Sequence, residues 1–101
     1  MNIKIVKLIN GEIIVGNVVE ENDKCIISDH LQIAMTEQGI GFVDFNNRLS
    51  EPGSLEVNMS NVLYYMTPRP DLLSGYTNIV QQQKAENAGI YIPNINDIAN
   101  V

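Results

Sequence analysis

Few residues in this chain are suited to acid–base or nucleophilic chemistry. Asp29 and His30 are adjacent, and a carboxylate beside an imidazole can form a general base. Neighbouring residues of a strand point to opposite faces, so we expect a surface or turn histidine rather than a catalytic pair. Cys25 lies in an apolar run with only Lys24 as a basic neighbour, which predicts a buried, inert thiol. No catalytic residue is assigned, and the sequence predicts a protein that is not an enzyme.

The acidic cluster Glu20, Glu21 and Asp23 matches a calcium loop only in part. It lacks the glycine and the distal bidentate glutamate of such loops, so a solvated turn is predicted. One cysteine and one histidine cannot build a zinc site. Neither a metal nor another cofactor is therefore expected.

Length and charge restrict the remaining classes of function. The chain has 101 residues, which fits one small domain, and 45% of them are hydrophobic, as in ordinary globular proteins. Six basic residues against twelve acidic ones give a net charge of −6, which disfavours DNA binding and attachment to an anionic membrane. No apolar run approaches the roughly 20 residues of a transmembrane helix, and no secretory signal is visible. With a single cysteine, a cytoplasmic location is predicted.

Strands must position most of these residues. Residues 3–9 are rich in β-branched side chains, and Asn10-Gly11 is a strong hairpin signal because both residues tolerate a positive φ. The return strand, residues 13–19, alternates between two faces. The inner face is predicted to carry Ile14, Gly16 and Val18, and the outer face to carry Ile13, Val15, Asn17 and Val19. A glycine in mid-strand permits a sharp bend. Further strands are predicted at residues 25–36 (kinked at Asp29-His30), 40–45, 55–60 and 62–67.

After Pro68 the apolar residues follow a helical period, which predicts a helix from about residue 70 to 86. The predicted fold is mainly β: a small, strongly bent, antiparallel barrel of SH3 type with five to six strands, followed by this helix. The predicted parts are the barrel at residues 1–69, a helix packing on it at 70–88, and an arm or tail at 89–101. The apolar residues on the outer face of the first two strands are more than a lone barrel can hide; they are Ile5, Ile9, Ile13, Val15 and Val19. We expect the helix to cover part of this outer apolar set, and the C-terminal arm or a neighbouring subunit to cover the rest.

Two segments carry a family resemblance. The segment VKLINGEIIVGNV, residues 6–18, resembles the first signature of the Sm/Lsm proteins, which are related to bacterial Hfq: an apolar strand, a Leu-x-Asn-Gly turn and a Gly-x-apolar motif in a bent second strand. The segment VNMSNVLYYM, residues 57–66, resembles a divergent second signature. An insertion at residues 46–54 and a helix after the last strand depart from the usual layout. Compact members with this order of elements are associated with tailed bacteriophages of marine bacteria. Another small SH3-type barrel with the same hairpin is the alternative.

The resemblance implies a homo-oligomeric ring. In such rings the last strand of one subunit pairs with the fourth strand of the next, which removes two exposed edges. The residues that this resemblance places at the interface are Leu55, Val57, Met59, Val62, Tyr64 and Met66. Tyr64 and Tyr65 alternate, so one is expected to face the core and the other the outside.

The resemblance also implies single-stranded RNA at the pore, where bases stack and polar groups recognise base edges. Ile26 occupies a position at which the family hydrogen-bonds a base, and the arginine of the second signature is missing. The family positions that keep polar or charged groups here, and are the candidate RNA-binding residues, are Asn22, Lys24, Asn58 and Ser60.

The predicted function is therefore an Sm-like ring that binds RNA or acts in RNA regulation with altered pore chemistry. Its expected partners are copies of itself and single-stranded RNA, without DNA or membrane. The alternative is a structural or protein-interaction ring that does not bind RNA, which the acidic charge and the lost pore residues favour.

Overall fold

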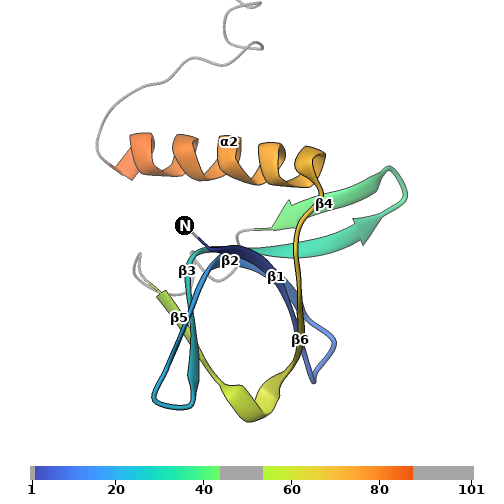
Figure 1. The fold of residues 1–101 in the computed structure, drawn as a ribbon. Coiled ribbons are helices and arrows are strands. Elements are labelled where there is room, and N and C mark those ends of the chain that lie inside the picture. Colours follow the sequence, from blue (N-terminus) through green and yellow to red (C-terminus); the bar gives the residue numbers. More distant parts are fainter. Residues whose placement is uncertain (1, 44–53, 88–101) are drawn as a thin grey trace, which may run out of the picture.

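The structure is a computed structural model that describes residues 2–43 and 54–87. These residues form six strands, one turn of 3-10 helix and one α-helix (Figure 1): β1 (Ile3–Leu8), β2 (Ile13–Glu21), β3 (Lys24–Thr36), β4 (Gly39–Val43), β5 (Ser54–Asn58), η1 (Met59–Asn61), β6 (Val62–Met66) and α2 (Pro70–Asn87). The prediction of a mainly β fold with a C-terminal helix is confirmed. The predictions for residues 44–53 and for the arm or tail at 89–101 lie outside the described residues.

All strand pairs are antiparallel, in the order β4-β3-β2-β1-β6, with β5 also paired to β3. The first half of β3 pairs with β5, and its second half pairs with β4. The change of partner occurs around Asp29, whose φ of 53° is in the left-handed region that asparagine and aspartate tolerate better than most residues. The kink predicted at Asp29-His30 is therefore present.

The sheet bends sharply at Gly16. The register between β2 and β3 shifts between Val15 and Asn17, and β3 passes very close to the glycine. A Cβ atom built on Gly16 would collide with Ile27 Cγ2 and lie 2.8 Å from the carbonyl oxygen of Ser28. Glycine is thus required here by the close approach of two backbones.

The described sheet is not closed, so the predicted barrel is not confirmed. β5 pairs with β3 and β6 pairs with β1, while β5 and β6 do not pair with each other. The connection between them is η1, a 3-10 turn rather than a hairpin, and the two strands diverge from it along opposite sides of the bent sheet (Figure 1).

Two apolar clusters lie on the two faces of the bend. The inner core, on the concave face, contains Val6, Leu8, Ile14, Val18, Cys25 and Ile27. The outer core lies between the convex face and α2 and contains Ile5, Val15, Leu31, Tyr76 and Val80. The predicted alternation along β2 is confirmed for its buried side chains, because Ile14 and Val18 lie in the inner core and Val15 lies in the outer core. The helix covers part of the outer apolar set, but Ile9 and Val19 remain 57% and 50% exposed.

Candidate functional site

The turn that follows β2 meets the second of the two resemblance segments at one end of the sheet. The turn between β2 and β3 contains Asn22 and Asp23, both with positive φ, and it lies against η1. The backbone N–H of Met59 donates to the carbonyl oxygen of Asp23 at 2.9 Å. Lys24 and Asn58 are direct partners across β3 and β5. We call this place, formed by residues 22–24 and 58–61, the loop junction.

All four candidate RNA-binding residues lie in the loop junction, and all are exposed. Asn22 and Asn58 present amides that can donate and accept hydrogen bonds, and Ser60 presents a hydroxyl. The structure therefore brings together polar groups that are far apart in the sequence: Asn22 is 36 positions from Asn58 and 38 positions from Ser60.

Carboxylates dominate the charge around the loop junction. Lys24 Nζ lies 3.5 Å from Glu56 Oε2, and both side chains are about half exposed, which makes this ion pair worth at most about 1 kcal/mol. Glu21 and Asp23 are exposed and adjoin the same turn, so with Glu56 three carboxylates accompany one ammonium group. Such a surface attracts phosphates weakly.

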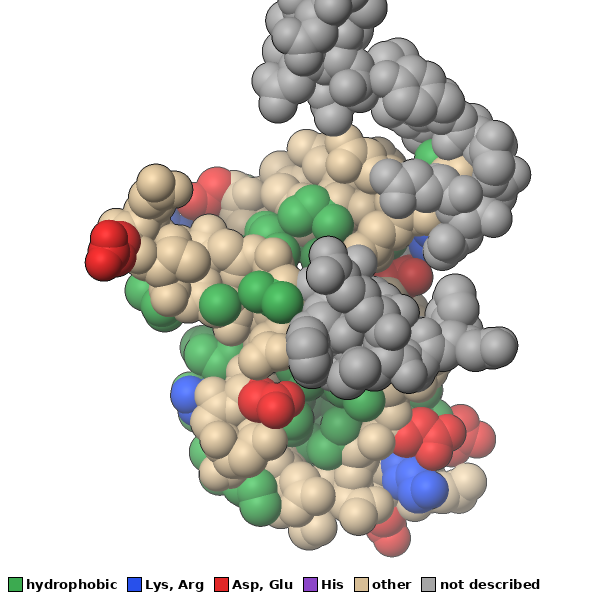
Figure 2. All heavy atoms as spheres, turned by 180° about the vertical axis from the view of Figure 1, so that it is seen from behind, with side chains coloured by type: hydrophobic (Ala, Val, Ile, Leu, Met, Phe, Trp, Pro, Cys, Tyr) green, Lys and Arg blue, Asp and Glu red, His purple; other side chains and the backbone are tan. Residues whose placement is uncertain are grey.

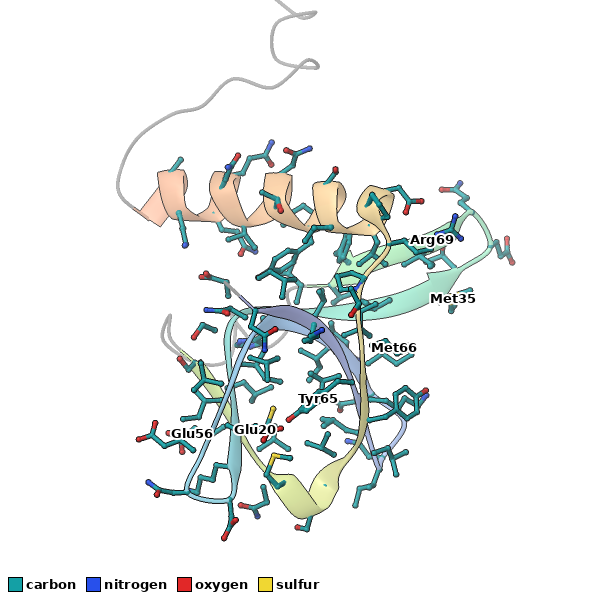
Figure 3. All side chains as sticks on the ribbon, in the orientation of Figure 1. Glu20, Met35, Glu56, Tyr65, Met66 and Arg69 are labelled. Carbon is teal, nitrogen blue, oxygen red and sulfur yellow. The ribbon has the colours of Figure 1, made fainter. Side chains whose placement is uncertain are left out.

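Behind the loop junction, Tyr65 points into the inner core (Figure 3), and its hydroxyl donates to Met59 Sδ at 3.5 Å. Burial raises the pKa of Tyr65 above its usual range, and hydrogen bonds with Cys25 and Glu20 raise it further. Burial likewise raises the pKa of the Cys25 thiol, although its hydrogen bond with Tyr65 opposes this. The thiol is completely buried and protonated, which agrees with the predicted inert cysteine.

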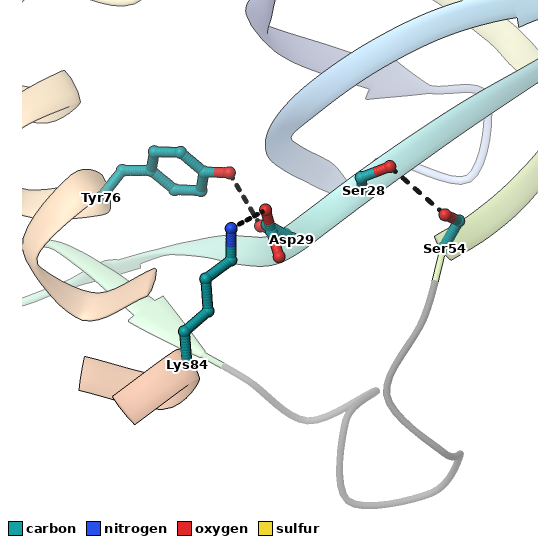
Figure 4. A network of polar contacts seen from close by, with 5 residues as sticks. All are labelled: Ser28, Asp29, Ser54, Tyr76 and Lys84. Carbon is teal, nitrogen blue, oxygen red and sulfur yellow. Dashed lines mark hydrogen bonds and ion pairs between the residues drawn. The ribbon is translucent and has the colours of Figure 1, made fainter. Parts of the chain in front are cut away.

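A second polar cluster joins α2 to the kink of β3 (Figure 4). The hydroxyl of Tyr76 donates to the carbonyl oxygen of Asp29 at 2.9 Å, and Lys84 Nζ lies 3.1 Å from Asp29 Oδ2. Beside them, the hydroxyls of Ser28 and Ser54 lie 3.3 Å apart and link β3 to β5. We call Asp29, Tyr76 and Lys84 the Asp29 cluster.

The prediction of a surface or turn histidine is wrong, because His30 is only 5% exposed. The positive φ of Asp29 breaks the simple alternation of the strand, and the Cα atom of His30 packs against Gly16, 3.3 Å from the point that a Cβ atom on this glycine would occupy. The carboxylate of Asp29 is engaged with Lys84 on the helix. Asp29 and His30 therefore take part in the packing of the sheet and the helix. No local pattern in the sequence indicated that Tyr76 and Lys84 of the helix would contact Asp29.

The two margins of the bent sheet, β5 and β6, are unpaired in the described chain, and the outer edge of β4 is unpaired as well. β5 pairs only with β3, and β6 pairs only with β1. Among the predicted interface residues, Leu55, Val57, Met59 and Val62 pack their side chains against the inner core, so they would reach a neighbour through their backbones. Tyr64 and Met66 are 47% and 43% exposed, and Leu63, which the sequence did not single out, is 57% exposed.

Within residues 2–43 and 54–87, no three His, Cys, Asp or Glu side chains are grouped so that they could hold a metal ion. The helix found in this part of the chain is not long and apolar enough to cross a membrane. The sequence matches no protein-family model, and comparison with curated proteins gives no match.

Proposed function

We propose that this protein is an Sm-like homo-oligomeric ring that acts in the cytoplasm by binding single-stranded RNA. The single observation that carries the proposal is the bond from the Met59 N–H to the Asp23 carbonyl oxygen, which joins the turn after β2 to the second signature segment and so brings the four candidate RNA-binding residues into one loop junction. The exposed amides of Asn22 and Asn58 supply groups for base edges.

Ring formation is supported by the two unpaired margins. β5 and β6 lie on opposite sides of the bent sheet, so β5 of one copy can extend the sheet of the next copy at β6 (Figure 1). Unpaired strand edges otherwise promote uncontrolled aggregation, and head-to-tail pairing that closes on itself removes those of β5 and β6. The exposed Tyr64 and Met66 would then be covered by the neighbouring copy. The barrel-like shape of each subunit is part of this proposal, with β5 and β6 pairing with neighbouring copies rather than with each other.

RNA binding at the loop junction would depend on hydrogen bonds more than on phosphate contacts. Each copy offers one ammonium group there, that of Lys24, and it already lies beside Glu56. For single strands the logarithm of affinity falls with the logarithm of salt concentration by about 0.7 per phosphate neutralised. A binding site of this kind therefore has a shallow salt dependence.

The test is a fluorescence anisotropy titration with U-rich and A-rich RNA oligomers at several salt concentrations. We expect binding at micromolar protein, weakened several-fold by Asn58→Ala. The matched control is Gln81→Ala, an exposed polar residue on α2 away from the loop junction. Absence of binding by both oligomers at micromolar protein contradicts RNA binding.

A second candidate function is a structural or protein-interaction ring that does not bind RNA. The observation that favours it is the excess of exposed carboxylates, those of Glu21, Asp23 and Glu56, over one ammonium group at the loop junction. Light scattering coupled to size exclusion separates the candidates. A mass several times 11.2 kDa without RNA binding supports the second function, whereas a monomer contradicts the ring itself.

A further inference from the structure

The apolar face of the β3–β4 hairpin continues beyond the helix that covers it. Ile33 and Phe42 are partners across the two strands and belong to the outer core under α2. Gly75 lets the helix come close, since a Cβ there would lie 3.3 Å from Phe42 Cε2. Two positions further out, Met35 and Ile40 are partners on the same face, by strand alternation. They are 76% and 56% exposed, and we call this pair the hairpin face.

The hairpin face lies on the β6 side of the molecule. Figure 1 shows the β3–β4 hairpin projecting past β6, and Figure 3 places Met35 and Met66 on that side, with Glu20 and Glu56 on the other. Hydrophobic side chains lie on the surface of this hairpin when the molecule is seen from behind (Figure 2). An exposed apolar pair at the end of a projecting hairpin is placed to meet a neighbouring copy.

The C-terminal segment starts on the opposite side of the molecule. The helix α2 begins shortly after β6 and spans 18 residues, about 27 Å. Its last turns reach the β5 side, where Lys84 contacts Asp29 next to the Ser28–Ser54 pair. The helix therefore ends on the β5 side, and in the proposed head-to-tail ring this side would adjoin the β6 side and the hairpin of the next copy.

The composition of residues 88–101 suits an apolar surface. These fourteen residues contain one charged side chain, Asp97, and four isoleucines, namely Ile90, Ile92, Ile95 and Ile98. Fully extended, they would span up to roughly 46 Å. To reach the hairpin face of its own copy, the segment would have to double back along the whole of α2, whereas the hairpin of the neighbour lies next to its starting point.

We propose that residues 88–101 of one copy dock their isoleucines on the hairpin face of the adjacent copy. This inference rests on the proposed ring and adds to it a second contact between copies. The occupant of the hairpin face is thus a defined segment of this chain, supplied by a second molecule.

The first test is cross-linking between two different full-length chains. One carries Met35→Cys and the other carries Ile92→Cys, and the native chain serves as the control for Cys25, which is buried. After mixing and oxidation, we expect a covalent dimer that forms only with both variants present. Replacing Met35→Cys by Gln81→Cys, on the exposed part of α2, should abolish it. Absence of the mixed dimer from chains that still form a ring overturns the docking and leaves the ring intact.

A chain that carries both cysteines distinguishes the two possible routes of the segment. A cross-link closed within one molecule, seen as a faster-migrating monomer, overturns docking between copies. A native chain that is monomeric by light scattering overturns both the ring and the docking.

The second test measures assembly in the full chain. We expect Ile92→Asp with Ile95→Asp to raise the concentration at which the ring dissociates at least tenfold. The matched control is Asn94→Asp with Asn96→Asp, which adds the same charge to the same segment and keeps the isoleucines. Equal dissociation of the two variants overturns the role of the isoleucines.

Discussion

At the scale of single residues, Asp29 connects the sheet to the helix. Its left-handed backbone is costly for most residues other than glycine, asparagine and aspartate. Its carbonyl oxygen and its carboxylate are both engaged by α2, through Tyr76 and Lys84. The contacts that offset the backbone strain are thus the same contacts that hold the helix over the kink of β3.

Tyr76→Phe is expected to lower the free energy of unfolding by about 1 kcal/mol at neutral pH, because the hydrogen bond to the Asp29 carbonyl oxygen is lost. Burial, with a smaller effect of Asp29, raises the pKa of Tyr76 from 10.0 to about 12. Between these values the folded chain keeps a proton that the unfolded chain loses, so the free energy of unfolding falls as the pH rises. The variant should show a shallower fall from about pH 9.5 upwards.

Urea unfolding of the native chain and the variant at pH 7 and through the alkaline range checks this prediction. Gln81→Ala, at an exposed position of the same helix, is the control and should leave the pH dependence unchanged. Identical alkaline slopes for the native chain and Tyr76→Phe would contradict it.

The kink at Asp29 and the contacts that it makes were not equally predictable from the sequence. The kink at Asp29 was predictable, since an aspartate and a histidine interrupt an apolar strand pattern. The partner Tyr76 lies 47 positions away, and no local pattern connects the two. His30 was misplaced for the same reason, because strand alternation holds only where the backbone stays extended.

At the scale of elements, α2 depends on the sheet for its stability. It contains Gly75 and several residues of low helical propensity, and most of the stability of helices in proteins comes from packing of their apolar face. Its buried side chains, Tyr76 and Val80, lie in the outer core. The helix therefore forms chiefly because packing on the convex face stabilises it.

Val80→Ala is expected to lower the free energy of unfolding by about 1 to 3 kcal/mol, since it removes buried methyl groups from the outer core. Gln81→Ala, on an exposed position of the same helix, should change it by less than about 0.5 kcal/mol. Thermal or urea unfolding measures both. Equal effects would mean that the helix is held mainly by its ends rather than by the outer core.

The positions of the strands and the helix were more predictable from the sequence than the way in which the strands pair. The Asn-Gly turn, the alternation in β5 and the helical period after Pro68 predicted the strands and a helix within one residue of its observed end. The pairing of β3 with two strands, β5 along its first half and β4 along its second half, was not predictable. It depends on the left-handed backbone of Asp29, where the partner changes, and on the return of β5 to the edge of β3 that β4 also occupies. The motif positions did predict which polar residues meet at the loop junction. The ion pair of Lys24 with Glu56 follows only from the observed register of β3 and β5.

At the scale of the whole molecule, charge should act in opposite directions on the two proposed kinds of binding. Each copy carries a net charge of −6, so copies repel one another in a ring. Raising the salt concentration from 0.1 M to 1 M shortens the screening length from about 10 Å to about 3 Å. We expect assembly to strengthen over this range while RNA binding weakens.

Sedimentation equilibrium at both salt concentrations, with anisotropy measured in parallel, checks this prediction. Assembly that weakens as salt rises would contradict it and would mean that ion pairs between copies outweigh the overall repulsion. RNA affinity that stays constant would mean that no phosphate is neutralised in the complex.

The shared use of β3 by β4 and β5 has a practical consequence. Both strands pair along the same edge of β3, so the chain leaves that edge after Val43 and returns to it at Ser54. The ladders on either side are fixed independently, by Gln32 with Val43 and by Ser28 with Ser54. A foreign peptide inserted between these anchors should therefore leave both ladders in register, because each ladder is held by pairs that lie outside the insertion.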